Sequence, residues 1–335
     1  MLRAISMQRA LRWLPLLALT ALLSVGLWAH RAEAVGQCAN RGDLDSMFCD
    51  DDEDLVADLP EDPSKWQNPD VLFFSYSPVE DPSVYVNMFK PFLDHIKEVT
   101  GKEVRYFTAQ SYAAQIEAMR SGRLHIAGIS TGPTAFAVNL AGYVPFALMG
   151  NEKGQYGYRL QVIVPAKSPI QTLADLKGHT VAHTEESSNS GNQAPRALLP
   201  LHGIVPDKDY KVVYSGGHDR SVLGVAHGDY EAANIASSVM DRMMDRGVVK
   251  RDAIRVIWQT DPFPTTSFGE VYNLDPVLAL KIRKAFFTYK FKGTPLGKEF
   301  KGVDGFIPIT YKQHWSVIRQ IQKANNVKYT REAVK

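Results

Sequence analysis

TVAHTEESSNSGNQAPRALL, residues 180–199, sets a short apolar stretch before a polar turn and an apolar helix start. Hydroxyls and a glycine at a strand-to-helix turn suit a small oxyanion. The reason is that the first N–H groups of a helix lack internal partners and carry partial positive charge. A polar loop ending in a serine helix cap is the alternative. The predicted anion-binding residues are Ser187, Ser188, Asn189, Ser190 and Gly191.

The first 34 residues have the pattern of a secretory signal peptide. Arg3, Arg9 and Arg12 precede an apolar run from Leu14 to Trp28, and Ala32-Glu33-Ala34 supplies the small residues of a cleavage site. We therefore predict export and cleavage after Ala34. An uncleaved anchor helix is the alternative, although the apolar run is short for a membrane span.

The charge and length exclude several classes of protein. Residues 1–34 carry four arginines and one glutamate, so their removal changes the formal charge from +2 to −1. Without a basic excess, a nucleic-acid partner is not expected, and no later apolar stretch is long enough to cross a membrane. The length of 335 residues suits a soluble globular protein with more than one domain.

Two cysteines, Cys38 and Cys49, follow the predicted cleavage site. A close pair in an exported chain predicts a local disulfide. Lipid attachment at Cys38 is an alternative, but the bulky Gln37 precedes it where such sites take a small residue. A metal pair lacks a neighbouring histidine.

An acidic segment follows the cysteines. Asp50, Asp52, Asp54 and Asp58 stand at relative positions 1, 3, 5 and 9, which is the spacing of an oxygen-lined calcium loop. The sixth position is Leu55, where such a loop needs glycine. Two interpretations of this segment therefore stay open. It is either a calcium site or an acidic, solvated linker that continues to the first strand.

The folded body is predicted to alternate strands and helices. Strands are expected at residues 71–76, 104–108 and 126–130, with helices at 84–100 and 112–120 between them. This order implies a parallel sheet covered by helices. A second group of strands is expected at residues 158–165, 180–184, 211–214, 232–237 and 255–258, and helices at 274–287 and 311–325 complete the chain. The pattern indicates two α/β units, the second inserted in the first.

Over nearly all of residues 71–325 the chain resembles the periplasmic substrate-binding proteins of phosphate, phosphite and phosphonate ABC transporters. The segment at 35–70 lies outside the resemblance. The matching pieces are residues 187–191 with Pro195, Gly217-His218-Asp219, Ile170 to Gly178, Gly132-Pro133, and residues 306–311 with Ile318 and Arg319.

The resemblance implies an α/β type II periplasmic binding protein whose two lobes are mostly parallel sheets flanked by helices and joined by two crossover strands. Ligand would lie between the lobes, at the carboxyl ends of strands. The expected crossovers end at Pro165 and near Thr260. The expected parts are a signal peptide at 1–34, an acidic cysteine-containing linker at 35–69, lobe one at 70–163 plus 263–335, and lobe two at 164–262.

The resemblance also implies roles for the residues of the site. Ser188, Asn189, Ser190 and Gly191 would hold the anion, with Ser187 in support. His218 would donate to a ligand oxygen, and a bound dianion would favour its charged form. Tyr76, Ser130 and Thr131 of lobe one would close over the ligand. A surface position for His218 and ordinary strand-end solvation for the others are the alternatives, and Asp219 would either orient His218 or form an Asx turn.

The expected ligand is small. Relatives that bind aminoalkyl phosphonates need carboxylates for the ammonium group, and this chain has Ser238 and Thr266 at the corresponding positions. Burying an unpaired ammonium is costly. We therefore expect phosphite, methylphosphonate or phosphate, with Phe263, Pro264 and Thr265 beside Thr266 on the wall.

The expected function is capture of this phosphorus oxyanion in the periplasm by a monomer that closes and docks on an ABC-transporter permease. No cofactor is expected. One alternative is a sensor that presents the anion to a membrane receptor kinase. Another is a phosphonate or phosphate ester hydrolase, against which the sequence offers neither a metal-ligand cluster nor a supported Ser-His-acid order.

Overall fold

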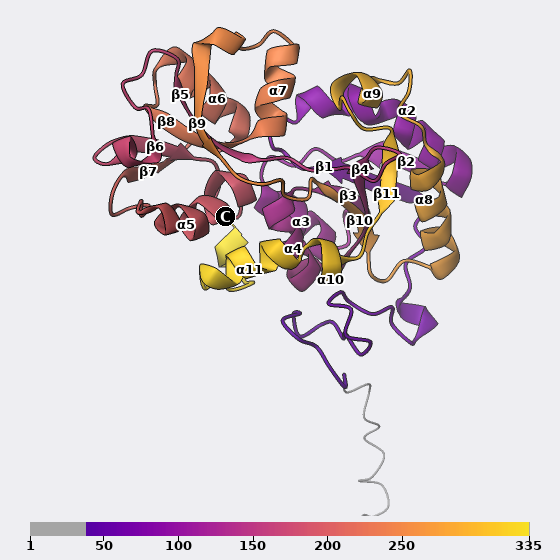
Figure 1. Cartoon of the computed structure of the whole chain (residues 1–335). Helices are drawn as coiled ribbons and strands as arrows, with labels where there is room; N and C mark the ends of the chain where they lie inside the picture. The colour runs from indigo at the N-terminus through magenta and orange to yellow at the C-terminus, as the bar shows by residue number, and fades with distance from the viewer. Residues whose placement is uncertain (1–37, 335) are drawn as a thin grey trace, which may run out of the picture. The chain divides into compact units, whose positions relative to one another are not determined.

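The computed structural model describes residues 38–334, so the predicted signal peptide at 1–34 lies outside the described residues. The chain divides into two units, Met1–Ala39 and Asn40–Lys335, and the fold reported below is that of the second unit (Figure 1). Among the described residues, no helix combines the length and the apolar character that crossing a bilayer requires. The predicted disulfide is confirmed, because both Cys38 and Cys49 are disulfide-bonded.

The second unit contains a six-stranded sheet with the order β11-β4-β10-β3-β1-β2. We call this sheet and its helices lobe one. Its strands are β1 (Val71–Tyr76), β2 (Glu103–Tyr106), β3 (Ile126–Ile129), β4 (Tyr143–Gly150), β10 (Ser267–Val271) and β11 (Gly305–Pro308). Its helices are α2 (Ser83–Thr100), α3 (Tyr112–Arg120), α4 (Thr131–Ala141), α8 (Pro276–Thr288), α9 (Pro295–Glu299), α10 (Tyr311–His314) and α11 (Ser316–Ala324), with short helices η1 (Pro63–Lys65) and η6 (Glu332–Val334).

A five-stranded sheet with the order β7-β6-β8-β5-β9 forms the second part of the fold, which we call lobe two. Its strands are β5 (Leu160–Pro165), β6 (Thr180–His183), β7 (Lys211–Tyr214), β8 (Ala232–Ala236) and β9 (Ile254–Gln259). Its helices are η2 (Leu173–Leu176), η3 (Asn189–Gln193), α5 (Ala194–Leu198), η4 (Leu199–His202), α6 (His218–His227), α7 (Ser237–Asp245) and η5 (Arg251–Ala253).

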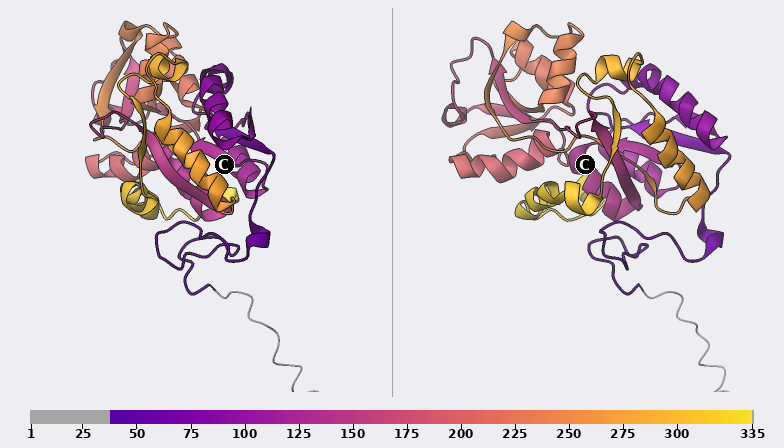
Figure 2. Two further views of the ribbon diagram at one scale, coloured as in Figure 1. Left: turned by 90° about the vertical axis from the view of Figure 1, so that its right-hand side faces the viewer. Right: turned by 45° about the vertical axis from the view of Figure 1, so that its right-hand side comes forward.

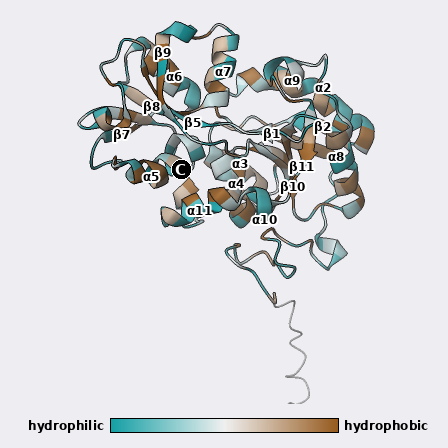
Figure 3. Ribbon diagram, in the orientation of Figure 1, coloured by the Kyte–Doolittle hydropathy of each residue, from teal (hydrophilic) through white to brown (hydrophobic). Residues whose placement is uncertain are grey.

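Hydrophobic spacing explains how the helices cover the sheets. In α2, Tyr85, Phe89, Phe92 and Ile96 recur every three or four residues and are all buried, so one face of the helix packs on the core. Gly101 ends the helix in the left-handed conformation, with φ 75°. Helices α2 and α8 lie side by side (Figure 2), and both carry hydrophobic as well as hydrophilic residues (Figure 3).

The pairing of the strands is more mixed than the expected mostly parallel sheets. In lobe one, β1 pairs in parallel with β2 and β3, whereas β10 is antiparallel to both β3 and β4. In lobe two, β6 pairs in parallel with β7 and β8, whereas β5 is antiparallel to β8 and β9. Strands β5 and β10 are the first strands after each crossover. The chain therefore enters each sheet from the side of the other lobe and runs against its neighbours.

The two crossover segments, residues 151–159 and 260–266, pair with each other. Tyr158 N–H donates to Phe263 O at 3.1 Å, and Phe263 N–H donates to Tyr158 O at 2.8 Å. The crossovers therefore precede β5 and follow β9, rather than being the strands that end at Pro165 and near Thr260. The expected lobe boundary after residue 163 falls inside β5, all of which belongs to the five-stranded sheet.

The described part of the expected acidic linker at 35–69, called the acidic segment below, is not solvated throughout. Leu44 and Phe48 are buried in the core of lobe one, and the ring of Phe48 lies 4.9 Å from that of Tyr272. Asp45 accepts a hydrogen bond from Arg120 at 2.9 Å. Apolar side chains at intervals in this segment thus fix it on lobe one, although its charge pattern resembles that of a linker.

Candidate functional site

The turn predicted to bind an anion follows β6 and forms the π-helical segment η3, which continues into α5. Ser188 caps it, because its Oγ accepts from Gly191 N–H at 3.1 Å. A Cβ atom on Gly191 would lie 1.8 Å from Thr184 Oγ1, so only glycine fits at this position. The polar sequence therefore folds as a tight helix start.

Buried polar side chains form a hydrogen-bond network with this turn. His183 Nδ1–H donates to Asn192 Oδ1 at 2.8 Å, and its Nε2 accepts from Tyr210 Oη at 3.0 Å. Asn192 Nδ2 in turn donates to Glu186 O at 2.7 Å. Burial lowers the pKa of His183 to about 4, so this histidine stays neutral and both of its ring nitrogens are satisfied. The network fixes the backbone of the turn.

A cavity of about 560 Å³ lies between the two lobes, with residues of both sheets and both crossovers on its wall. Seven of the ten predicted ligand-binding residues come together there. They are Tyr76, Ser130, Thr131, Ser188, Asn189, His218 and Thr266.

Helix starts converge on this cavity. Ser130 is the N-cap residue of α4 and Thr131 its first residue, Ser188 is the N-cap residue of η3, and Ser237 begins α7. All four line the cavity. The N-terminus of a helix presents N–H groups and partial positive charge, so the arrangement favours an anion.

His218 differs from the expectation in its charge. Its Nδ1 accepts from Ala236 N–H at 3.1 Å, so the ring proton is on Nε2, which lies 3.4 Å from Ser188 Oγ. Burial, with a smaller contribution from the charge of Arg242, lowers the pKa of His218 to about 3. His218 is therefore a neutral donor at the cavity and not the predicted imidazolium. Nor does Asp219 orient it, because Asp219 accepts from Asp81 N–H at 3.2 Å.

The lobe-one residues on the wall are tied to the second crossover. Thr131 Oγ1 donates to Pro264 O at 2.8 Å, and Tyr76 Oη lies 3.3 Å from Thr266 Oγ1. Burial raises the pKa of Tyr76, which keeps its hydroxyl protonated and able to donate. This part of the wall offers hydroxyl groups whose positions are fixed by the crossover.

Three predicted residues do not line the cavity. Ser187 is buried, and its Oγ donates to Val334 O at 3.2 Å. Ser190 Oγ is buried without a hydrogen-bond partner, and Gly191 supports the cap of the turn. These three residues therefore contribute to the structure of the turn and not to the cavity wall.

The sequence reasoning missed other residues of the wall. Tyr158 accepts from Asn189 Nδ2 at 3.1 Å and so links the first crossover to the turn. The carboxylates of Asp241, Asp245 and Glu299 line the cavity together with Ser238. The expectation of a small ligand relied on the absence of carboxylates from this wall, and the structure does not support that premise. Asp241 lies one helical turn after Ser238, a spacing that would have identified it.

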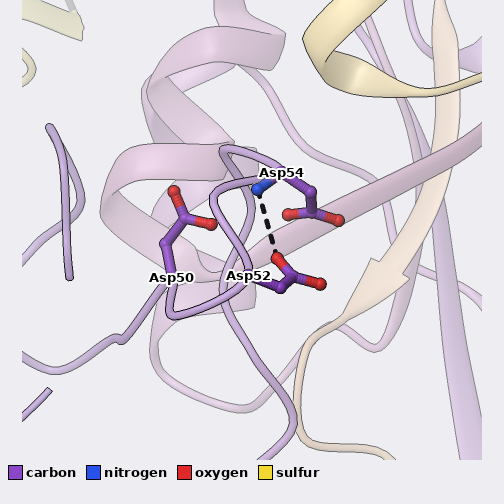
Figure 4. A group of neighbouring side chains, drawn as sticks. All are labelled: Asp50, Asp52 and Asp54. Carbon is purple, nitrogen blue, oxygen red and sulfur yellow. Dashed lines mark hydrogen bonds between the residues drawn. The ribbon is translucent and has the colours of Figure 1, made fainter. Parts of the chain in front are cut away.

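The possible calcium site is assembled only in part. Carboxylate oxygens of Asp50, Asp52 and Asp54 lie within 4.8 Å of one another (Figure 4), and among the described residues Asp58 does not join the group. Asp50 is buried and accepts from Leu55 N–H at 3.1 Å, and Asp52 accepts from Asp54 N–H at 3.1 Å. Burial raises the pKa of Asp50, and the neighbouring carboxylates act in the same direction. These hydrogen bonds give the carboxylates of Asp50 and Asp52 partners within the turn without an ion.

A family model and two related proteins with binding or import descriptions match this chain. A family model of ABC-transporter phosphonate periplasmic substrate-binding proteins matches residues 74–315. The phosphate-import protein PhnD of Mycolicibacterium smegmatis is 27% identical over 243 residues, which cover 69% of this chain and 75% of that protein. The phosphonates-binding periplasmic protein of Escherichia coli is 28% identical over 203 residues, which cover 59% of this chain and 60% of that protein.

Solved structures share the fold. The binding component of an ABC phosphonate transporter from Pseudomonas aeruginosa superposes with a TM-score of 0.69 at 24% identity, covering 76% of this chain and 87% of that chain. PhnD1 from Prochlorococcus marinus in complex with methylphosphonate gives a TM-score of 0.68 at 17% identity, covering 77% of this chain and 99% of that chain. The predicted type II periplasmic binding protein fold is thus confirmed. Because the family model spans most of its length, the chain belongs to the family of periplasmic substrate-binding proteins of phosphonate ABC transporters.

Proposed function

We propose that this protein captures a phosphorus oxyanion, namely phosphite, methylphosphonate or phosphate, in the interlobe cavity and delivers it to an ABC-transporter permease. The observation that carries the proposal is the cavity wall, which is lined from both lobes by the polar residues Ser130, Thr131, Ser188, Asn189 and His218. A ligand bound by both lobes stabilises the closed form by its differential affinity for that form. The permease would then recognise the closed form.

The descriptions of related proteins support this ligand class. The relative from M. smegmatis is a phosphate-import protein, and the neighbour from P. marinus was solved with methylphosphonate. The signal-peptide pattern and the disulfide are consistent with an oxidising compartment outside the cytoplasm. We therefore place the mature protein in the periplasm.

A binding role fits the chemistry of the cavity better than a hydrolytic one. A general base works best with a pKa near the operating pH. His218, which lies beside Ser188, has a pKa lowered to about 3 and its Nδ1 is occupied by Ala236 N–H. It can donate a hydrogen bond, but it is a poor acceptor of a proton from a serine.

Isothermal titration calorimetry of the mature protein against phosphite, methylphosphonate and phosphate tests the proposal, with aminoethylphosphonate and sulfate as comparison ligands. We expect tight binding of at least one of the three anions. Failure of all three to bind would refute the proposed ligand class, and turnover of a phosphorus ester would refute the binding role.

Two serines of one turn provide a matched pair of variants. Ser188→Ala removes a hydroxyl from the cavity wall and should weaken binding by about 1.5–3 kcal/mol, the range for hydrogen bonds to charged groups. Ser187→Ala removes a hydroxyl that donates to Val334 O away from the wall and should leave the affinity within about threefold of wild type. Equal losses in both variants would argue against contact between Ser188 and the ligand.

A further inference from the structure

Arg242 is a buried cation on the wall of the cavity. It belongs to α7, the helix whose first residues Ser237 and Ser238 also line the cavity, and only 8% of its surface is exposed. Its guanidinium lies over the ring of Phe300, with Cζ 5.1 Å from the ring centroid. A cation in this position has lost most of its water and must be stabilised by neighbouring groups.

Those neighbouring groups come from the other lobe. Arg242 Nη2 donates to Glu80 Oε1 at 3.1 Å and to Tyr85 Oη at 3.3 Å. Its Nε lies 3.5 Å from Glu299 Oε1 without forming a hydrogen bond. Glu80 precedes α2, and Glu299 ends α9. The guanidinium of lobe two is thus held by two carboxylates of lobe one.

Arg246, one turn further along α7, makes closely related contacts. It donates to both Glu80 and Glu299, yet it does not line the cavity. Within the ion-pair group of Arg242, Arg246, Glu80 and Glu299, the cation that faces the cavity is therefore Arg242. Glu299 also lies on the wall, but Arg246 offsets its charge, and Glu80 does not line the cavity.

The other buried groups of the wall are uncharged; of the wall carboxylates, Asp241 and Asp245 are exposed and Glu299 is partly buried. His218 is neutral, and the remaining donors are hydroxyls and amides. Among the described residues of the wall, the two other basic side chains, Arg251 and Lys301, are exposed and each pairs with Asp245. At both Tyr76 and His218, the effect of the Arg242 charge exceeds that of Glu80. A phosphorus dianion moved from water into this cavity would have Arg242 as its nearest buried counter-charge.

We propose that Arg242 is a specificity-determining residue: its positive charge complements the bound oxyanion, and its ties to Glu80 and Glu299 couple that charge to contact between the lobes. The inference deepens the proposed function and rests on it. Because low-dielectric surroundings strengthen charge interactions, a single buried cation can have a large effect on an anion that lies nearby.

The test compares Arg242→Gln, Arg242→Lys and Arg246→Gln by calorimetry with methylphosphonate, phosphite and phosphate. Arg246→Gln is the matched control, because it removes a cation from the same helix and the same carboxylates but not from the wall. We expect Arg242→Gln to weaken binding by about tenfold or more, equivalent to 1.4 kcal/mol, and Arg246→Gln by no more than about threefold. Arg242→Lys, which keeps the charge but not the planar fork, should recover much of the loss.

Arg242→Gln leaves Glu80 with fewer partners and could destabilise the protein, so Arg242→Gln/Glu80→Gln serves as a second variant in which both members of the pair are neutral. We expect this double variant to fold and to bind as weakly as Arg242→Gln. Equal affinities of the Arg242 and Arg246 variants, or an Arg242→Lys variant as weak as Arg242→Gln, would overturn the inference and leave a purely structural ion pair. Absence of binding by the wild type would instead refute the proposed ligand class, and the inference with it.

Discussion

His218 illustrates how burial keeps a histidine of the cavity wall neutral, while a hydrogen bond fixes which ring nitrogen carries the proton. Because Ala236 N–H occupies Nδ1, protonation of that nitrogen would break a buried backbone hydrogen bond and place a cation in a desolvated position. Under the proposed function, the site would therefore offer its anion a neutral imidazole donor. The sequence motif correctly marked His218 as a residue of the cavity, but its charge depends on a backbone group 18 residues away.

The lowered pKa of His218 predicts how stability changes with pH. His218 stays unprotonated in the native state down to about pH 3, whereas the unfolded histidine takes up a proton below its ordinary pKa of 6.5. The unfolded state binds more protons in this window, so stability falls as the pH falls from 6.5 towards 3. Urea unfolding at pH 7 and pH 5 should show that His218→Gln loses about 2 kcal/mol less than the wild type on acidification. Identical losses would contradict a neutral, buried His218.

Gly132 lies where lobe one meets the turn of lobe two. A Cβ atom there would lie 2.1 Å from Ser187 O and 2.6 Å from Asn189 N, and both of these are backbone atoms. Gly132→Ala should therefore displace the turn and weaken anion binding by about tenfold or more, with a stability cost of about 1–3 kcal/mol. Calorimetry and urea unfolding measure the two effects.

Gly224→Ala is the control for that substitution. Gly224 belongs to α6, and its added Cβ would lie 2.3 Å from the ring of Tyr230, away from the cavity wall. It should lower stability and leave affinity unchanged. If Gly132→Ala bound the anion as well as the wild type, the close approach of α4 to the turn would not matter for the site.

Helices and strands with a clear hydrophobic periodicity, or with clear start and stop signals, were predicted well. Helix α3 and strand β7 have the predicted bounds, and α2 and β6 differ by a residue or so at one end. Helix α4 was missed, because Thr131-Gly132-Pro133-Thr134 has the composition of a loop and every residue of the helix is buried. A helix that is buried on all sides shows no amphipathic period. Strand β10 was also missed, because its interior Gly269 weakens the strand pattern.

The candidate site was predicted to the extent that its residues lie within local motifs. The 187–191 turn and His218 are recognisable from short stretches of sequence. Tyr158 and Arg242 are not, because their roles arise from contacts between the lobes: Asn189 donates to Tyr158, and Glu80 accepts from Arg242. A single sequence does not encode such pairings in any local pattern.

The docked acidic segment leads to a prediction about lobe one. Phe48 is 3% exposed and packs edge-to-face on Tyr272, so Phe48→Ala should lower the free energy of unfolding by about 3 kcal/mol. Anion affinity should not change, because neither ring lines the cavity. Urea unfolding and calorimetry check the two parts. An effect on stability below about 0.5 kcal/mol, the usual size for a surface substitution, would mean that the segment is a solvated linker after all.

At the scale of the whole molecule, the lobes are held together by contacts to the loop that carries Val79 and Glu80. His218 N–H donates to Val79 O at 3.1 Å, and Arg242 and Arg246 bind Glu80. These bonds favour contact between the lobes even before ligand contacts are counted. The affinity for ligand depends on the fraction of molecules in the binding-competent state, so weakening the interlobe contacts lowers the apparent affinity without changing a ligand contact.

Glu80→Gln tests this coupling between closure and affinity. Glu80 is 4% exposed, accepts from both arginines of α7, and does not line the cavity. Although burial opposes its ionisation, Arg242 and Arg246 lower the pKa of Glu80, so it is charged at neutral pH. Removing this charge leaves the buried Arg242 and the more exposed Arg246 with one carboxylate and should cost about 3 kcal/mol of stability.

We expect ligand-free Glu80→Gln to have a larger radius of gyration than the wild type in small-angle X-ray scattering, and saturating anion to restore the compact value. Glu270→Gln is the control, because Glu270 is a buried carboxyl of lobe one that pairs with Arg283 at 2.9 Å within the same lobe. That variant should change stability but not the radius. If Glu80→Gln matched the wild type in radius with and without anion, the ion pairs would stabilise the fold without controlling closure. Closure would then depend on ligand contacts alone.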